Sequence, residues 1–146
     1  MSLIDGFYPG SKTPRQAPIF VDREVSDEPW DADPIIRTVR GKEMEFFSIG
    51  ALAKCLGRSI VGIRLWERKG RIPTAPYRMP DHAGGKGDRL YTREIIEATY
   101  HEFAIRGLIA PVGMEPPRVR WAKQHADLTA RLVEVWSTLV EQQKHA

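Results

Sequence analysis

The 146-residue sequence predicts a mainly α fold with a small β-hairpin, or wing, and a separate C-terminal helix. Two short helical patterns follow each other across a tight turn, two β-favouring runs flank a glycine-rich loop, and the stretch after Pro117 contains neither glycine nor proline. With 42% hydrophobic and 28% charged residues, the chain can bury the core of one ordinary domain. A multi-domain enzyme is therefore not expected.

The first third of the chain is predicted to contain an arm and a hairpin. Residues 1–34 hold five prolines and a cluster of acidic side chains, which predicts an extended acidic arm that is available to a protein partner. Residues 35–47 are predicted to form a β-hairpin, because 35–39 and 44–47 are β-favouring runs on either side of a turn that contains Gly41.

Two short helices are predicted between residues 48 and 70. Ser48 is a good N-cap, the apolar residues after it recur on one helical face, and Gly57 is a natural C-cap. Ser59 then caps a second helix that closes at Gly70. Two short helices joined by a tight turn are typical of the helix-turn-helix, whose second helix enters the major groove of DNA. A helical hairpin with a solvated outer face is the alternative.

A β-wing and a third helix are predicted next. Residues 77–79 and 88–91 are expected to pair around the glycine-rich loop 82–87, and Thr92 is expected to cap a helix that runs on to Gly107. The wing offers Arg78, Lys86 and Arg89 to phosphates. The domain at 48–109 is thus predicted to be a winged helix-turn-helix.

The charge of the chain is uneven. Its formal net charge is only +3, but residues 1–45 carry six basic and nine acidic side chains, whereas residues 46–109 carry eleven and six. The predicted helical domain is therefore the basic part, as expected of a part that binds an anionic partner.

Three motifs in this basic region resemble the MerR-type winged helix-turn-helix in order, spacing and residue type. They are residues 47–53 (FSIGALA), 64–73 (RLWERKGRIP) and 89–92 (RLYT), and the resemblance covers about residues 46–109. It implies a domain that binds duplex DNA, with the second helix in the major groove and the wing on the flanking backbone.

Individual positions match or depart from the family. Arg64 matches the conserved arginine of the second helix, Arg89 and Tyr91 match the arginine and tyrosine of the wing, and Trp66 stands where tyrosine is common. The family often has arginine, threonine and tyrosine where this chain has Val61, Gly62 and Leu65, and Val61 is suited to an apolar contact with a thymine methyl. The expected DNA-binding residues are Ser59, Val61, Gly62, Arg64, Trp66, Arg68, Lys69, Arg78, Lys86, Arg89 and Tyr91.

Residues 117–144 are predicted to form one amphipathic helix. Apolar side chains seven residues apart suggest a contact between copies in a homo-oligomer, either a dimer or a higher assembly. MerR-type regulators are similar in that they dimerise through a C-terminal helix. Packing of this helix back onto its own domain is the alternative. The expected oligomerisation residues are Trp121, Leu128, Leu132, Val135 and Leu139.

No enzyme, cofactor or metal site is expected. The four histidines show no metal-ligand spacing and are expected at the surface, and Cys55 is expected to pack beside the first helix. No apolar run is long enough to span a membrane, so a soluble, cytoplasmic protein is expected. The resemblance to the MerR-type family implies that the cell is bacterial or phage-infected.

The predicted function is duplex-DNA binding, as a transcriptional regulator or as a phage or mobile-element DNA-recognition protein of the small-terminase or excisionase kind. The alternative is an assembly module that keeps the winged fold without binding DNA.

Overall fold

The structure, a computed structural model, describes residues 33–79, 88–111 and 113–145. The chain divides into two units, 1–33 and 34–146, and the second contains nearly all the described residues. The predicted arm, except for its last two positions, and the wing loop with Lys86 lie outside the described residues.

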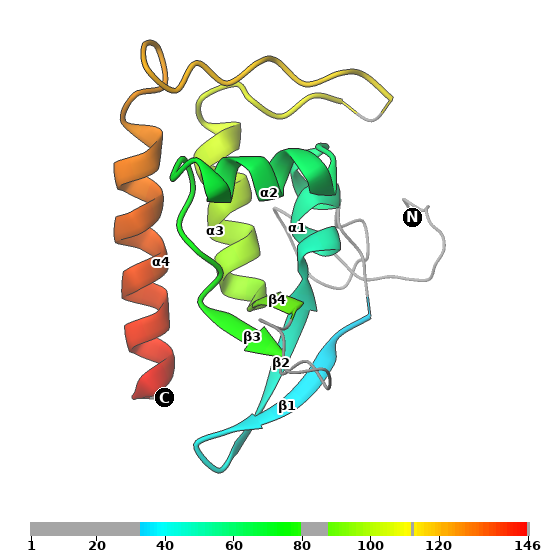
Figure 1. Ribbon diagram of the computed structural model, residues 1–146, viewed down its shortest axis with the longest axis vertical. Helices are drawn as coiled ribbons and strands as arrows, with labels where there is room; N and C mark the ends of the chain where they lie inside the picture. Colours follow the sequence, from blue (N-terminus) through cyan, green and yellow to red (C-terminus); the bar gives the residue numbers. More distant parts are fainter. Residues whose placement is uncertain (1–32, 80–87, 112, 146) are drawn as a thin grey trace. The chain divides into compact units, whose positions relative to one another are not determined.

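The described residues form four helices and one four-stranded antiparallel sheet, in the strand order β1-β2-β4-β3 (Figure 1). The fold is therefore mixed α and β, and the expectation of a mainly α fold was too narrow. The strands are β1 (Ile35–Val39), β2 (Lys42–Ser48), β3 (Tyr77–Met79) and β4 (Asp88–Tyr91). The helices are α1 (Ile49–Leu56), α2 (Ile60–Arg68), α3 (Arg93–Ala104) and α4 (Leu128–Lys144).

The sheet joins two hairpins that were predicted as separate features. β1 and β2 pair across a two-residue turn in which Arg40 and Gly41 have φ values of 54° and 75°. Positive φ at both central residues is the geometry whose twist matches that of a hairpin. The end of β2 then pairs with β4, so that Phe47 lies opposite Tyr91. The first hairpin therefore continues into the sheet of the second.

The predicted ends of α1, α2 and α3 are confirmed to within a few residues. α1 follows Ser48 and ends at Gly57, whose φ of 69° suits a residue without a Cβ. α2 begins at Ser59, whose Oγ accepts a hydrogen bond from the Gly62 amide at 3.0 Å. α3 begins at Thr92, whose hydroxyl accepts one from the Ile95 amide at 3.3 Å.

The core lies where α1 meets α2, α3 and the inner ends of β2 and β4. Phe47, Leu52, Ile63, Ile95 and Phe103 are fully buried there. They come from β2, α1, α2 and α3, so this burial fixes α2 to the rest of the fold. Cys55 is buried in α1, as predicted.

The C-terminal helix is shorter than predicted. α4 begins at Leu128; in place of the first part of the expected helix 117–144, residues 117–120 are irregular and residues 121–127 form turns. The reason is a closed local turn: the Arg120 amide donates to Nδ1 of His125 at 2.8 Å, and the His125 amide donates to the Arg120 carbonyl at 2.9 Å. His125 is buried, which corrects its predicted place at the surface, whereas His101 and His145 are exposed.

α4 packs on α3 of its own chain (Figure 1). Leu128, Leu132 and Trp136 are buried in this contact, and the Trp136 indole N–H donates to Oγ1 of Thr99 at 2.9 Å. The prediction that Leu128 and Leu132 face a second copy is therefore wrong, because α3 already covers them. The other three expected oligomerisation residues, Trp121, Val135 and Leu139, are half-buried.

Polar contacts hold both ends of α4. Near its start, the buried carboxylate of Glu102 in α3 accepts hydrogen bonds from Arg106 at 2.9 Å and from Arg131 of α4 at 3.1 Å. Near its end, Gln143 donates to the Thr92 hydroxyl at 2.9 Å and accepts from the Tyr77 hydroxyl at 2.7 Å. α4 is thus an integral part of this unit.

Candidate nucleic-acid interface

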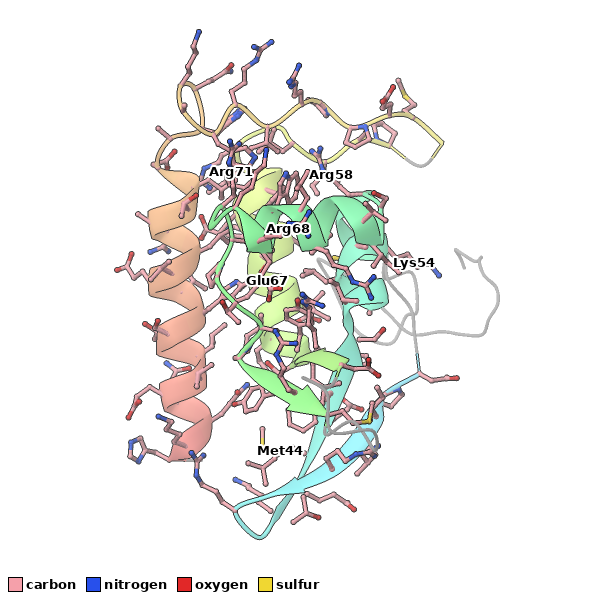
Figure 2. All side chains as sticks on the ribbon, viewed as in Figure 1. Met44, Lys54, Arg58, Glu67, Arg68 and Arg71 are labelled. Carbon is pink, nitrogen blue, oxygen red and sulfur yellow. The ribbon has the colours of Figure 1, made fainter. Side chains whose placement is uncertain are left out.

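The outer face of α2 is the most exposed basic surface among the predicted site residues. Arg64, Arg68 and Lys69 are exposed, and between them Val61 and Leu65 keep 73% and 36% of their surface. Ile63 faces the opposite way and is fully buried. Its burial fixes the helix with the basic side outward, and Figure 2 shows Arg68 on this helix with Arg58 and Arg71 near its two ends.

This face carries only positive charge. In the part of the chain that the structure describes, none of Arg64, Arg68 and Lys69 forms an ion pair, so no described carboxylate neutralises their charges. Glu67 is the only acidic residue of α2, and its side chain turns inward with 8% of its surface exposed. A helix with free cations outward and its one acid inward is suited to an anionic surface.

Arg89 is held by this inward acid. Nε of Arg89 in β4 donates to Oε1 of Glu67 at 2.5 Å, and Oε2 of Glu67 accepts from the Ala75 amide at 2.8 Å. The prediction of Arg89 as a free phosphate contact is corrected, because its charge is neutralised by Glu67. Its role in this arrangement is to orient α2 against β4.

Tyr91 does not reach the surface. Its side chain is fully buried, its ring meets the Trp136 ring edge-on at 5.8 Å between centroids, and burial raises the pKa of its hydroxyl well above the ordinary value. The prediction of Tyr91 as a DNA contact is therefore wrong. The hydroxyl has no hydrogen-bond partner among the described residues.

Trp66 is packed inward and lies away from the outer face of α2. Its ring centroid lies 5.8 Å from that of Phe103 and 5.1 Å from that of Trp121, and the Arg58 guanidinium lies 5.3 Å from it. The prediction that Trp66 contacts DNA is therefore corrected. Trp66 instead joins α2 to α3 and to the segment before α4.

The remaining predicted residues have varied surroundings. Ser59 is exposed, with its hydroxyl engaged at the start of α2. A Cβ at Gly62 would lie 3.1 Å from the Ser59 Oγ, so the cap gives a steric reason for glycine where the MerR-type family often has threonine. Arg78 is half-buried in β3.

Three basic residues near α2 were not predicted as site residues. Arg58 and Arg71 flank the helix in sequence, so their position next to a recognition helix was a usable signal. Arg118 comes from the segment before α4 and lines the same hollow as both. Nothing local in the sequence indicates that this segment folds back towards α2.

Other kinds of site are not found in the described part of the chain. Within residues 33–79, 88–111 and 113–145, no group of three or more histidine, cysteine, aspartate or glutamate side chains is placed to hold a metal ion. No helix among the same residues combines the length and the apolar character needed to cross a membrane. Comparisons of the chain with protein-family models, with curated proteins and with solved structures found no match.

Proposed function

We propose that this chain binds duplex DNA through α2, as a MerR-like winged helix-turn-helix protein. The observation that carries the proposal is the outer face of α2, where Arg64, Arg68 and Lys69 are exposed and unpaired among the described residues while Glu67 is turned inward. The chain order of α1, α2, the β3–β4 hairpin and α3 also supports it, because the MerR-type resemblance implies two helices followed by a wing.

The size of α2 suits the major groove. A helix with side chains is about 10–12 Å wide and the groove of B-DNA is about 12 Å wide, so the exposed half of α2 would enter it. Arg64, Arg68 and Lys69 would neutralise phosphates, which sets affinity, and Val61 would contact a thymine methyl, which adds sequence preference. The biological role would be transcriptional regulation, or DNA recognition in a phage or mobile element.

Fluorescence anisotropy with a short labelled duplex over a salt series tests this proposal. If three to five phosphates are engaged, the logarithm of the association constant should fall against the logarithm of salt concentration with a slope of about −3 to −5. Arg64→Ala and Lys69→Ala should each make the slope shallower by about 0.9. No binding at low salt would contradict the proposal.

The matched control is Lys144→Ala. It also removes one lysine charge, but at the C-terminal end of α4, where Lys144 pairs with Glu141 at 3.7 Å. Its slope should stay at the wild-type value. If Lys144→Ala and Lys69→Ala lowered the slope equally, α2 would not be the binding surface and the effect would reflect net charge alone.

The second candidate function is an assembly module that binds protein through the same helix. It is favoured by the apolar side chains on α2, since Ile60, Val61 and Leu65 expose 40%, 73% and 36% of their surface. Val61→Lys separates the two functions. It should strengthen DNA binding if α2 lies in a groove, and it should dissociate an assembly, as followed by sedimentation velocity without DNA, if α2 packs on protein.

A further inference from the structure

A basic hollow lies at the C-terminal end of α2, where the segment before α4 passes close to the helix. It has a volume of about 230 Å³, and its lining contains four cationic side chains and no acidic one. The cations come from both ends of α2 and from the later segment, and two tryptophan rings stand among them. The residues concerned are Arg58, Trp66, Lys69, Arg71, Arg118 and Trp121.

Arg58 is held in this hollow by backbone carbonyls, and no carboxylate of the described residues pairs with it. Its Nη2 donates to the carbonyls of Leu108 at 3.0 Å and Pro117 at 2.8 Å, while its Nε is buried without a hydrogen-bond partner among the described residues. This burial lowers the pKa of Arg58 from its ordinary value. A partly buried cation without a counter-ion costs free energy, which a bound anion would offset.

The tryptophan rings fix the positions of two guanidinium groups. Arg58 lies 5.3 Å from the Trp66 centroid, Trp66 meets Trp121 edge-on, and Arg71 lies 5.9 Å from the Trp121 centroid. Cation–π contacts of this kind hold a guanidinium in place while leaving its N–H groups able to donate. The hollow is therefore preorganised for an acceptor with several oxygens.

We propose that this hollow is a binding site for a phosphate group. Its volume lies below the roughly 300–1,000 Å³ of sites for drug-sized ligands, so it suits one phosphoryl or pyrophosphoryl group. Leu65 and Lys69 belong both to the hollow and to the outer face of α2. The phosphate belongs either to the backbone of DNA beside α2 or to a free phosphoanion. The first source rests on the proposed function, and the second does not.

The first arm of the test uses the full chain and pyrophosphate. In ¹⁵N-correlated spectra at constant ionic strength, the indole N–H resonances of Trp66 and Trp121 should shift saturably on addition of pyrophosphate. The Trp136 resonance should not, because that indole is buried against Thr99. Arg118→Glu should abolish the shifts and Arg118→Lys should retain them. Arg118 is exposed, so both variants are expected to fold.

The matched control in this arm is Arg120→Glu. Arg120 is exposed on the same segment, two residues from Arg118, and does not line the hollow. Its variant should keep the pyrophosphate shifts. Equal loss in Arg118→Glu and Arg120→Glu would overturn the site, because it would show a general charge effect.

The second arm measures DNA affinity against salt for Arg118→Ala and Arg120→Ala. A slope that becomes shallower by about 0.9 only in Arg118→Ala assigns the phosphate to DNA. An unchanged slope with saturable pyrophosphate shifts assigns it to a free phosphoanion. Saturable shifts in a chain that binds no DNA support the hollow and contradict the proposed function. Absence of saturable shifts together with an unchanged slope overturns the site.

Discussion

Glu67 of α2 and Arg89 of β4 are ion-paired at 2.5 Å, and the second oxygen of the same carboxylate accepts a hydrogen bond from the Ala75 amide at 2.8 Å. One side chain thus joins a helix, the loop that follows it and a strand of the sheet. The same contact also turns the only acid of α2 away from the exposed face. The pair therefore adds to the burial of Ile63 in orienting the helix, and it leaves Arg64, Arg68 and Lys69 as the charged side chains of the outer face.

Glu67→Gln should destabilise the fold by about 2 kcal/mol, because it removes a charge-assisted hydrogen bond and leaves the Arg89 guanidinium, which is only 24% exposed, without its counter-charge. Urea unfolding followed by circular dichroism measures this change. The control is Glu115→Gln at an exposed carboxylate, which should alter the unfolding free energy by less than about 0.5 kcal/mol. Equal losses in the two variants would contradict the structural role of the pair.

Ser59→Ala and Ser48→Ala should differ, although both serines precede a helix. The Ser59 hydroxyl accepts from the Gly62 amide, whereas the Ser48 side chain makes no capping hydrogen bond. Ser59→Ala should therefore cost about 1 kcal/mol of stability, and Ser48→Ala should cost much less. Thermal and urea unfolding of the two variants would show the difference. A larger loss in Ser48→Ala would mean that α1 is capped in another way.

Asp127 should contribute to a loss of stability in acid. The hydrogen bond from Arg106, at 2.6 Å, lowers the pKa of this carboxyl below its ordinary value of 3.8. The folded state therefore binds fewer protons than the unfolded state in this range, and the contribution of the pair is complete above pH 3.8 and is lost as the pH falls through the folded pKa. In Asp127→Asn, the unfolding midpoint should fall less steeply in this acid range. An acid limb identical to that of the wild type would contradict the pairing.

Trp136→Phe should destabilise the unit by about 2–3 kcal/mol, because the smaller ring leaves a cavity and the hydrogen bond to Thr99 is lost. The loss should be smaller in a Thr99→Val background, because this double-mutant cycle isolates the interaction between Trp136 and Thr99. Because α4 packs within its own chain, the effect of Trp136→Phe on the thermal midpoint should not depend on protein concentration. An effect that varies with concentration would mean that Trp136 stabilises a contact between copies.

Local chemistry is what sequence patterns predicted well. Ser59 and Thr92 accept hydrogen bonds from amides three residues later, and Gly57 adopts a positive φ that few other residues tolerate. Each of these features depends on a few neighbouring residues, so it can be read from a short window. The ends of α1, α2 and α3 followed from them.

Contacts distant in sequence could not be predicted in the same way. Arg89 and Tyr91 match a family pattern, but whether they face solvent depends on Glu67 and Trp136, which come from other elements. The seven-residue spacing in α4 marks an apolar face equally well for a partner copy or for α3. What decides between them is the presence of Thr99 and Glu102 opposite α4, which no pattern within the helix contains.

The attachment of α4 at Thr92 and Tyr77 bears on how the protein should be handled. Residues 46–109, which include the predicted winged helix-turn-helix, would by themselves expose the α3 surface that Leu128, Leu132 and Trp136 cover, and would leave Glu102 without Arg131. The smallest fragment expected to remain folded and free of aggregation therefore runs from Pro34 to at least Gln143. Experiments that replace α2 by another helix should therefore be made in this whole fragment.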